Sequence, residues 1–284
     1  MSSTGVSLLH IDIQRLRSEF REPHNLLTTS DGTTLFVRKW EAQGAPEETA
    51  ILILHGITAY SGPYSMIAEP LASRGFTVYG LDLRGHGLSD GNRGDAPSKE
   101  RFVKDLCETI GFVKDRHSRL TVLGHSLGVL SSLLAMGACV DQFDGAILLS
   151  GARTMRPGAY PPMGALQKVK ILFSSIFLPS RQVIGYRRDG MVGLNDPLFT
   201  FRYTLRFMRL ASLTDFSFPE EMPFPVLVGI GENDELFTVE AARELYDEIP
   251  SKTKEFFVAK GAKHAEFPAD SMMPMLDWVE RSFK

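Results

Sequence analysis

Residues 120–137, LTVLGHSLGVLSSLLAMG, place the pentapeptide GHSLG between two apolar runs. The run before it is short and contains β-branched residues, which is typical of a buried parallel strand. The run after it is uncharged and long enough for a buried helix. A strand, a tight turn and a helix in this order form a nucleophile elbow, which exposes a serine at the carboxyl end of a sheet. Gly124 and Gly128 remove side chains where strand and helix crowd together. The stretch therefore predicts Ser126 as a catalytic nucleophile.

A second stretch, GLSDG at residues 87–91, fits the same G-x-S-x-G pattern. It precedes a polar segment rich in Gly, Asn and Pro, which is typical of a loop rather than of a strand–turn–helix junction. We therefore expect Ser89 to shape a loop and Ser126 to be the nucleophile.

From residue 34 onward, apolar runs alternate with helical patterns. This alternation predicts an α/β fold with a mostly parallel central sheet and helices on both faces. Asp31-Gly32 is the expected turn of a hairpin that enters the sheet. The expected strands lie at 34–40, 50–56, 76–83, 120–125, 145–151, 225–231 and 254–261, and the expected helices at 64–74, 98–116, 127–139, 239–248 and 271–283.

One segment, residues 153–218, interrupts the alternation with a Pro/Gly cluster and two apolar helical patches. It is too long for an ordinary connection, because loops beyond about 15 residues are uncommon without a function. We expect it to be an inserted helical cap over the carboxyl ends of the strands, where open α/β sheets bind ligands. Residues 1–152 and 219–284 would then form the core.

A serine nucleophile in this fold is followed along the chain by an acid and then by a histidine. His264 is the histidine that lies beyond the next plausible acid, and it can take and return the Ser126 proton. The segment VLVGIGENDELF offers three acids at a strand end, and Asp234 is the preferred one. Glu232, Glu235 and the earlier Asp82 remain as alternatives.

Acyl transfer also needs donors for the developing oxyanion, which are usually backbone amides. We expect the amides of Leu127, directly after the nucleophile, and of Ile57, in the loop after an early strand. The segment 153–218 also carries apolar side chains that would form an acyl-binding tunnel above Ser126. These are Met155, Met163, Phe173, Phe177, Phe199, Phe207 and Met208.

The chain of 284 residues has ordinary globular composition and a net charge of −3, which gives no case for nucleic-acid binding. Its two cysteines lack a disulfide or C-x-x-C pattern, and its start lacks the basic region of a signal peptide. We therefore expect a cytoplasmic protein without metal or cofactor. Residues 153–218, however, carry ten basic and three acidic side chains, a net charge of +7. With KVKILFSSIFL at 168–178, this segment is a candidate for peripheral contact with anionic membrane.

Five motifs together resemble one known family: HGITAYSGPY, LDLRGHGLSDGNRGD, GHSLG, GENDELF and GAKHAEF. They are similar to the monoacylglycerol lipase and lysophospholipase-like branch of the serine α/β-hydrolases, over nearly the whole chain from residue 30. The resemblance implies an α/β-hydrolase fold, a Ser126–Asp234–His264 triad, and Ile57 and Leu127 as oxyanion donors. One departure is Thr58, which stands where lipases of this kind often have the second glycine of His-Gly-x-Gly.

The expected function is therefore hydrolysis of carboxylic esters of single-chain lipids through an acyl-enzyme on Ser126. A thioesterase, lysophospholipase, acyltransferase or peptidase would use the same triad. A non-catalytic ligand receptor on this fold would have little need of all three triad members in order. The substrate is expected to be a small acyl ester; the sequence sets neither its chain length and head group nor the oligomeric state.

Overall fold

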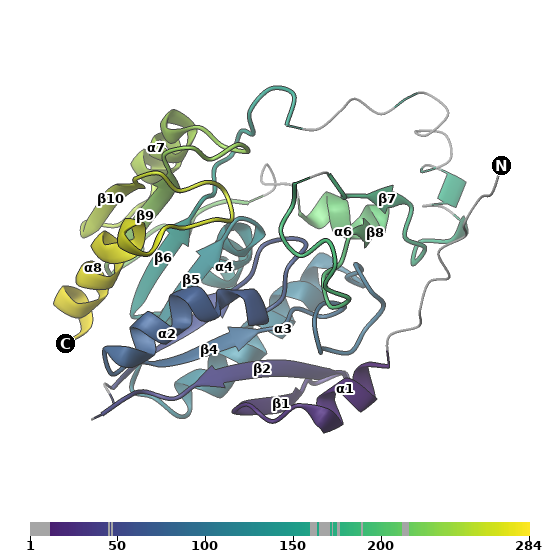
Figure 1. The fold of residues 1–284 in the computed structure, drawn as a ribbon, viewed down its shortest axis with the longest axis horizontal. Coiled ribbons are helices and arrows are strands. Elements are labelled where there is room, and N and C mark those ends of the chain that lie inside the picture. The colour runs from purple at the N-terminus through teal and green to yellow at the C-terminus, as the bar shows by residue number, and fades with distance from the viewer. Residues whose placement is uncertain are drawn as a thin grey trace.

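An eight-stranded sheet forms the centre of the computed structural model (Figure 1). The structure describes residues 12–44, 46, 48–159, 164, 171, 173–174, 177–188, 190–211 and 216–284. Strand β2 runs antiparallel to β1 and β4, and the other neighbours from β4 to β10 pair in parallel. In sheet order the strands are β1 (His24–Thr28), β2 (Thr34–Trp40), β4 (Thr77–Leu81), β3 (Thr49–Leu54), β5 (Arg119–His125), β6 (Gly145–Leu149), β9 (Val226–Gly231) and β10 (Lys254–Ala259).

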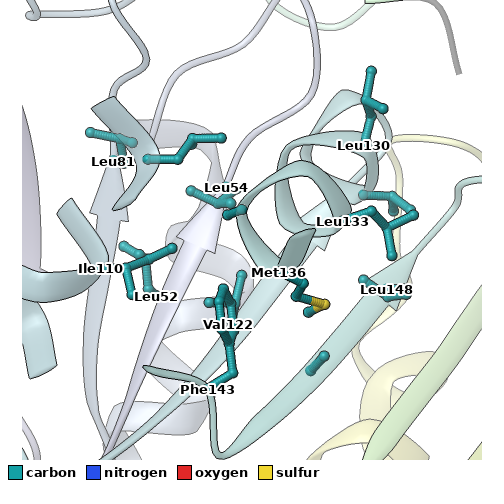
Figure 2. Close-up of a cluster of buried hydrophobic side chains, with 14 of the residues drawn as sticks. Leu52, Leu54, Leu81, Ile110, Val122, Leu130, Leu133, Met136, Phe143 and Leu148 are labelled. Atoms are coloured by element: carbon teal, nitrogen blue, oxygen red, sulfur yellow. The ribbon is translucent and has the colours of Figure 1, made fainter. Parts of the chain in front are cut away.

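Helices cover both faces of this sheet because its central strands are apolar on both sides. Along β3, Leu52 and Leu54 face a cluster that includes α3 and α4, whereas Ile51 and Ile53 face a cluster that includes α2 and α8. Figure 2 shows part of the first cluster, with Leu130 and Leu133 of α4 against the strands. The helices are α1 (Ile13–Glu19), η1 (Gly62–Tyr64), α2 (Ser65–Ser73), α3 (Lys99–Lys114), α4 (Leu127–Cys139), η2 (Val140–Gln142), α6 (Leu205–Leu210), α7 (Val239–Glu248), η4 (Ala269–Met272) and α8 (Met273–Phe283).

The predicted elements are present with small differences at their ends. α4 and α7 begin and end at the expected residues, and the hairpin turns at Asp31-Gly32, where Gly32 has a φ of 82°. α1 was not predicted, and β1, the first strand of the predicted hairpin, was expected without stated bounds. α1 is seven residues long and has no buried residue, and its two apolar side chains, Ile13 and Leu16, are too few to indicate a helix by their spacing.

The described part of 153–218 contains α6 and a two-stranded ribbon of β7 (Ile184–Gly185) and β8 (Arg202–Tyr203). This part contacts loops at the carboxyl ends of the strands. The N–H of Thr200 donates to the carbonyl of Thr58 over 2.9 Å, and the N–H of Thr204 donates to the carbonyl of Gly94 over 3.0 Å. Most of the first predicted helical patch, 164–178, lies outside the described residues. The division into core and cap stays a prediction.

Candidate active site

Ser126 lies between β5 and α4 in a strained turn, with φ of 56° and ψ of −114°. A positive φ is uncommon for a residue other than glycine, so the surroundings must hold it. Its N–H donates to the carbonyl of Leu149 over 3.0 Å. A Cβ on Gly128 would lie 1.9 Å from the carbonyl oxygen of Leu54, and one on Gly124 would lie 2.2 Å from that of Gly128. The predicted crowding of strand and helix at these glycines is therefore confirmed.

Three predicted side chains from the ends of β5, β9 and β10 form one hydrogen-bonded chain. His264 Nε2 lies 2.9 Å from Ser126 Oγ, and His264 Nδ1 lies 2.9 Å from Asp234 Oδ2. Because a carboxylate only accepts, Nδ1–H donates to Asp234, which leaves Nε2 as the acceptor for the Ser126 hydroxyl. The geometry is that of a general base oriented by an acid.

Asp234 is buried, with 1% of its surface exposed. Burial alone would raise the pKa of this carboxyl. The hydrogen bond and charge of His264, together with the N–H groups of Leu236 and Phe237, instead hold its pKa below the usual value. These two amides donate to Asp234 Oδ1 over 2.8 and 2.9 Å. The side chain is therefore fixed in its ionised form beside the His264 ring.

The alternative acids and the alternative serine have other partners. Glu232 accepts the N–H of Gly261, and buried Asp82 accepts the N–H groups of Ser61 and Leu88. Ser89, 1% exposed, bonds the N–H of Phe36 and the carbonyl of Asp82, which is the expected loop-shaping role. Glu235 is the exception, because its carboxylate accepts the backbone N–H of His264 over 3.0 Å. It holds the histidine's main chain rather than its ring.

Both residues predicted to donate to the oxyanion lie near Ser126: Leu127 follows it in the chain, and Ile57 lines the same cavity. Leu127 is the first residue of α4, so its N–H is among those with no carbonyl partner inside the helix. The loop of Gly56 and Ile57 lies against the nucleophile, since a Cβ on Gly56 would lie 3.4 Å from the Cβ of Ser126. The hydroxyl of Tyr203 donates to the carbonyl of Ile57 over 2.6 Å and thereby ties this loop to the segment 153–218.

Two buried histidines flank the site, and sequence reasoning gave them no role. His55 donates from Nδ1 to the carbonyl of Gly56 and accepts the N–H of Leu83 at Nε2. Burial lowers the pKa of His55 to about 4 and that of His125 to about 3. Both rings are therefore neutral at physiological pH. Their positions inside two quoted motifs, HGITAYSGPY and GHSLG, were the available signal.

A cavity of about 110 Å³ opens above Ser126 and His264. Its lining is mainly apolar, with Arg188, Glu235 and Glu266 as charged members. The apolar lining residues are Ile57, Ala59, Pro63, Met66, Ile67, Met191, Val192, Phe199, Leu236, Ala265 and Phe267.

Most of the predicted tunnel residues do not line this cavity. Among the lining residues described, Phe199 is the one member of that set. Phe207 is fully buried against Tyr203, and the rings of Phe173 and Phe177 are mostly exposed, with residue exposures of 61% and 64%. Apolar side chains of a short insertion pack on the core or lie on its surface, and composition does not distinguish these places. Met155 and Met208 pack against core clusters, and Met163 lies outside the described residues.

Over the described ranges, no group of three or more His, Cys, Asp or Glu side chains is arranged to hold a metal ion. The expected absence of a cofactor stays a prediction. Of the helices described, none is long and apolar enough to cross a membrane.

Comparisons with known proteins agree on a family. A family model described as "Serine aminopeptidase, S33" matches residues 45–268. The chain is 28% identical over 257 residues to a monoglyceride lipase of Rattus norvegicus, covering 85% of this chain and 82% of that one. It is 28% identical over 269 residues to a monoacylglycerol lipase of Mycolicibacterium smegmatis, covering 87% and 92%.

Solved structures agree on the fold. The crystal structure of Paleococcus ferrophilus monoacylglycerol lipase superposes with a TM-score of 0.70 at 25% identity, over 87% of this chain and 99% of that one. A soluble variant of monoglyceride lipase from Saccharomyces cerevisiae, in complex with a substrate analog, gives a TM-score of 0.75 at 17% identity, over 93% and 96%. The predicted α/β-hydrolase fold is confirmed.

Proposed function

The chain belongs to the serine aminopeptidase S33 family, and from this premise we propose that it hydrolyses carboxylic esters of single-chain lipids, monoacylglycerols foremost. The expected resemblance to monoacylglycerol lipases is confirmed at the level of the family, and the relatives support a carboxylic ester hydrolase. The observation that carries the proposal is the hydrogen-bonded chain from Ser126 through His264 to Asp234, at the floor of a largely apolar cavity.

In the proposed first half-reaction, Ser126 Oγ attacks the ester carbonyl carbon while its proton moves to His264 Nε2, which lies 2.9 Å away. The imidazolium that forms is stabilised by ionised Asp234. When the tetrahedral intermediate collapses, the bond to the alkoxy oxygen breaks and the Nε2 proton goes to that oxygen. The products of this half are the free alcohol and an acyl group on Ser126.

In the second half, a water molecule takes the place of the alcohol. His264 Nε2 accepts its proton as the water oxygen attacks the acyl carbon, and the same proton returns to Ser126 Oγ as the carboxylic acid leaves. The amides of Ile57 and Leu127 are the proposed donors to the carbonyl oxygen in both tetrahedral intermediates. Such donors are worth about 10²- to 10³-fold in kcat each.

The residues that line the cavity favour an acyl-binding site different from the tunnel predicted from residues 153–218. Met66 of α2 and Val192 line it and are also 49% and 44% exposed, so they mark where it opens to solvent. We propose that the acyl chain of the substrate runs from Ser126 between the side chains of Met66 and Val192, with Phe199 beside it. About 0.8 kcal/mol per buried methylene would favour long chains over short ones.

Hydrolysis of a series of substrates tests this function. The purified protein is first given p-nitrophenyl esters whose acyl groups increase in length. It is then given a monoacylglycerol, a lysophospholipid and an acyl-thioester that all carry the same acyl group. We expect the highest kcat/KM with monoacylglycerol and a rise with chain length. A preference for lysophospholipid or thioester would contradict the substrate, although not the serine mechanism.

Two variants locate the acyl chain. Phe199→Ala widens the proposed channel and is expected to change the preferred chain length of water-soluble esters. Phe177→Ala is the matched control, because Phe177 is 64% exposed and does not line the cavity. An unchanged chain-length profile in folded Phe199→Ala would place the acyl chain elsewhere.

We also propose that residues 153–218 contact anionic membrane. Phe173, Phe177 and Leu178 are 61%, 64% and 46% exposed, and the two rings lie 4.6 Å apart. Exposed basic side chains occur in the same segment at Arg181, Arg187, Arg202 and Arg209. Apolar side chains that enter the lipid interface beside cations that attract its charge are the features of interfacial binding.

Vesicle co-sedimentation tests this contact. We expect binding to phosphatidylcholine vesicles that contain phosphatidylserine, and weaker binding as salt rises. The double variant Phe173→Ser/Phe177→Ser should bind less while hydrolysing soluble esters at the wild-type rate. Equal binding to neutral and anionic vesicles, or to neither, would contradict the proposal.

A further inference from the structure

A buried tyrosine–histidine pair lies next to the proposed triad and takes no part in the reaction described above. Tyr64, in η1, and His125, the residue before Ser126, are 6% and 4% exposed. The Tyr64 hydroxyl lies 2.7 Å from His125 Nδ1, and the two rings meet edge to face with centroids 5.7 Å apart. Buried polar atoms are destabilising unless each has a hydrogen-bond partner, so we ask where the polar atoms of this pair find theirs.

Each end of the pair bonds the backbone of a different loop of the site. The N–H of Gly56 donates to the Tyr64 hydroxyl over 2.8 Å. At the other end, His125 Nε2 lies 2.7 Å from the backbone carbonyl of His264. The pair therefore links the loop that precedes Ile57, the turn that holds Ser126 and the loop that carries His264.

The direction of every hydrogen bond in this chain follows from the groups involved. A carbonyl only accepts, so His125 Nε2 carries the proton and donates to His264. Since burial keeps the His125 ring neutral, its Nδ1 must accept, and the Tyr64 O–H donates to it. The Tyr64 oxygen then accepts from Gly56. This tautomer of His125 satisfies all three bonds, whereas the other has no proton on Nε2 to donate to the carbonyl of His264.

His264 is consequently held at four atoms. Its ring is bonded to Asp234 and Ser126, its N–H donates to Glu235 and its carbonyl accepts from His125. The His125 and His264 rings are also in contact, with centroids 5.1 Å apart. A neutral His125 adds no positive charge beside the imidazolium that forms on His264 during acyl transfer.

We propose that Tyr64 and His125 are positioning residues of the proposed ester hydrolysis, which fix the backbone of His264 and of Gly56 relative to Ser126. This inference rests on the proposed function. The pair touches no reacting atom in the mechanism above, so it acts through the placement of the base and of the oxyanion loop. Such placement affects the transition state more than ground-state binding, because small errors in the position of a base reduce the rate steeply.

The variant Tyr64→Phe removes one oxygen and keeps the ring. It leaves Gly56 N–H and His125 Nδ1 without their partner. We expect kcat to fall about 10- to 100-fold while KM for a soluble ester changes less than about twofold. Tyr79→Phe is the matched control, because Tyr79 makes the same kind of edge-to-face contact and a 3.1 Å hydrogen bond with His117, remote from the cavity. It should leave kcat unchanged.

Two variants of His125 separate positioning from packing. His125→Gln keeps an N–H that can donate toward the His264 carbonyl, whereas His125→Leu has none. We expect kcat to decrease in the order wild type, His125→Gln, His125→Leu. Equal kcat in the two variants, at equal melting temperature, would overturn the claim that the donated hydrogen bond matters.

Nitrogen NMR of the full chain with ¹⁵N-labelled histidine gives a readout that activity does not. The proposal requires His125 to have protonated Nε2 and unprotonated Nδ1 at pH 7, and it predicts that the Nδ1 resonance shifts in Tyr64→Phe, which removes the hydrogen-bond donor to that atom. A wild-type spectrum with protonated Nδ1 would overturn it, as would a folded Tyr64→Phe enzyme with wild-type kcat. Ser126→Ala keeps the two claims apart: hydrolysis that survives Ser126→Ala refutes the proposed function, whereas inactive Ser126→Ala with fully active Tyr64→Phe refutes only the positioning role.

Discussion

The position of Ser126 depends on two neighbouring glycines, Gly124 and Gly128, at which a side chain would not fit. Its φ of 56° is one of two positive values among the non-glycine residues described, the other being Ser150 at 51°. Such a conformation costs about 1–3 kcal/mol and persists where the surroundings fix it. Here the fixing comes from β5 and α4, which meet at Gly124 and Gly128. The strain places Oγ at the start of α4, within reach of His264.

Replacing Asp234 by Asn tests the role of the acid. Asn keeps the size but removes the charge that stabilises the imidazolium, and it can favour the wrong His264 tautomer. We expect kcat to fall by about three orders of magnitude with little change in KM. Steady-state kinetics measures both. Glu232→Gln is the control, since Glu232 bonds Gly261 and not His264. If Asp234→Asn keeps near-wild-type activity, the acid is another residue.

At this scale the sequence predicted residues that follow from chain order and missed those that depend on three-dimensional contact. Ser126, Asp234 and His264 were selected by their order and by the strands before them, and the structure brings their side chains together. Tyr64 and His125 were missed because they are 61 positions apart along the chain. The partner of His125, the carbonyl of His264, is 139 positions away, and Gly56, which donates to Tyr64, is 8 positions away. The cavity residues were missed for the same reason, since Met66 and Ile67 lie on α2, far from 153–218.

At the scale of elements, α4 depends on close contact with β3. Its residues are mainly apolar and mostly buried, so packing rather than amphipathic pattern holds it in place. Two glycines of this helix differ sharply in surroundings. A Cβ on Gly128 would overlap the carbonyl of Leu54, whereas a Cβ on Gly137 would meet nothing within 4 Å.

This difference predicts opposite effects of one substitution. Gly128→Ala must push α4 away from β3, and we expect the free energy of unfolding to fall by about 3 kcal/mol or more. Gly137→Ala should instead raise it by up to about 1 kcal/mol, because alanine is the better helix former. Urea denaturation measures both values. Equal effects of the two substitutions would show that the contact between α4 and β3 is not as close as described.

Elements were predictable where burial leaves a periodic apolar pattern. α7 and α8 have apolar faces and were predicted within two residues at each end. α1 and the short strands β7 and β8 were not predicted, because seven or fewer residues with little burial leave no such pattern. β8 is held instead by tertiary contacts, such as that of the Tyr203 hydroxyl with the carbonyl of Ile57 over 2.6 Å.

At the scale of the whole molecule, three buried histidines predict sensitivity to acid. Burial lowers the pKa of His55 to about 4, that of His125 to about 3, and that of His86 well below its usual value. In the unfolded chain the pKa of each of these rings is about 6.5. Below that pH the unfolded state takes up protons that the folded state does not, so stability falls as pH falls from about 6.5 to about 4.

If the unfolded state binds three more protons than the folded state, the free energy of unfolding falls by up to about 4 kcal/mol for each pH unit of acidification near pH 5. Asp82, whose pKa is raised by burial, opposes this with one proton at most. Urea unfolding at pH 7.5, 6 and 5 measures the slope. His125→Gln should reduce it by about one proton, since glutamine does not titrate. A free energy of unfolding that stays constant or rises between pH 6.5 and 5 would refute the prediction.

The central claim is that Ser126 is the activated nucleophile, and labelling by a fluorophosphonate probe tests it most directly. Only a serine whose proton can pass to a neighbouring base reacts readily with such a reagent. We predict one labelled peptide by mass spectrometry, modified at Ser126, with labelling abolished in folded Ser126→Ala and strongly slowed in His264→Ala. Label that persists in Ser126→Ala, or that is found on Ser89, would contradict the account.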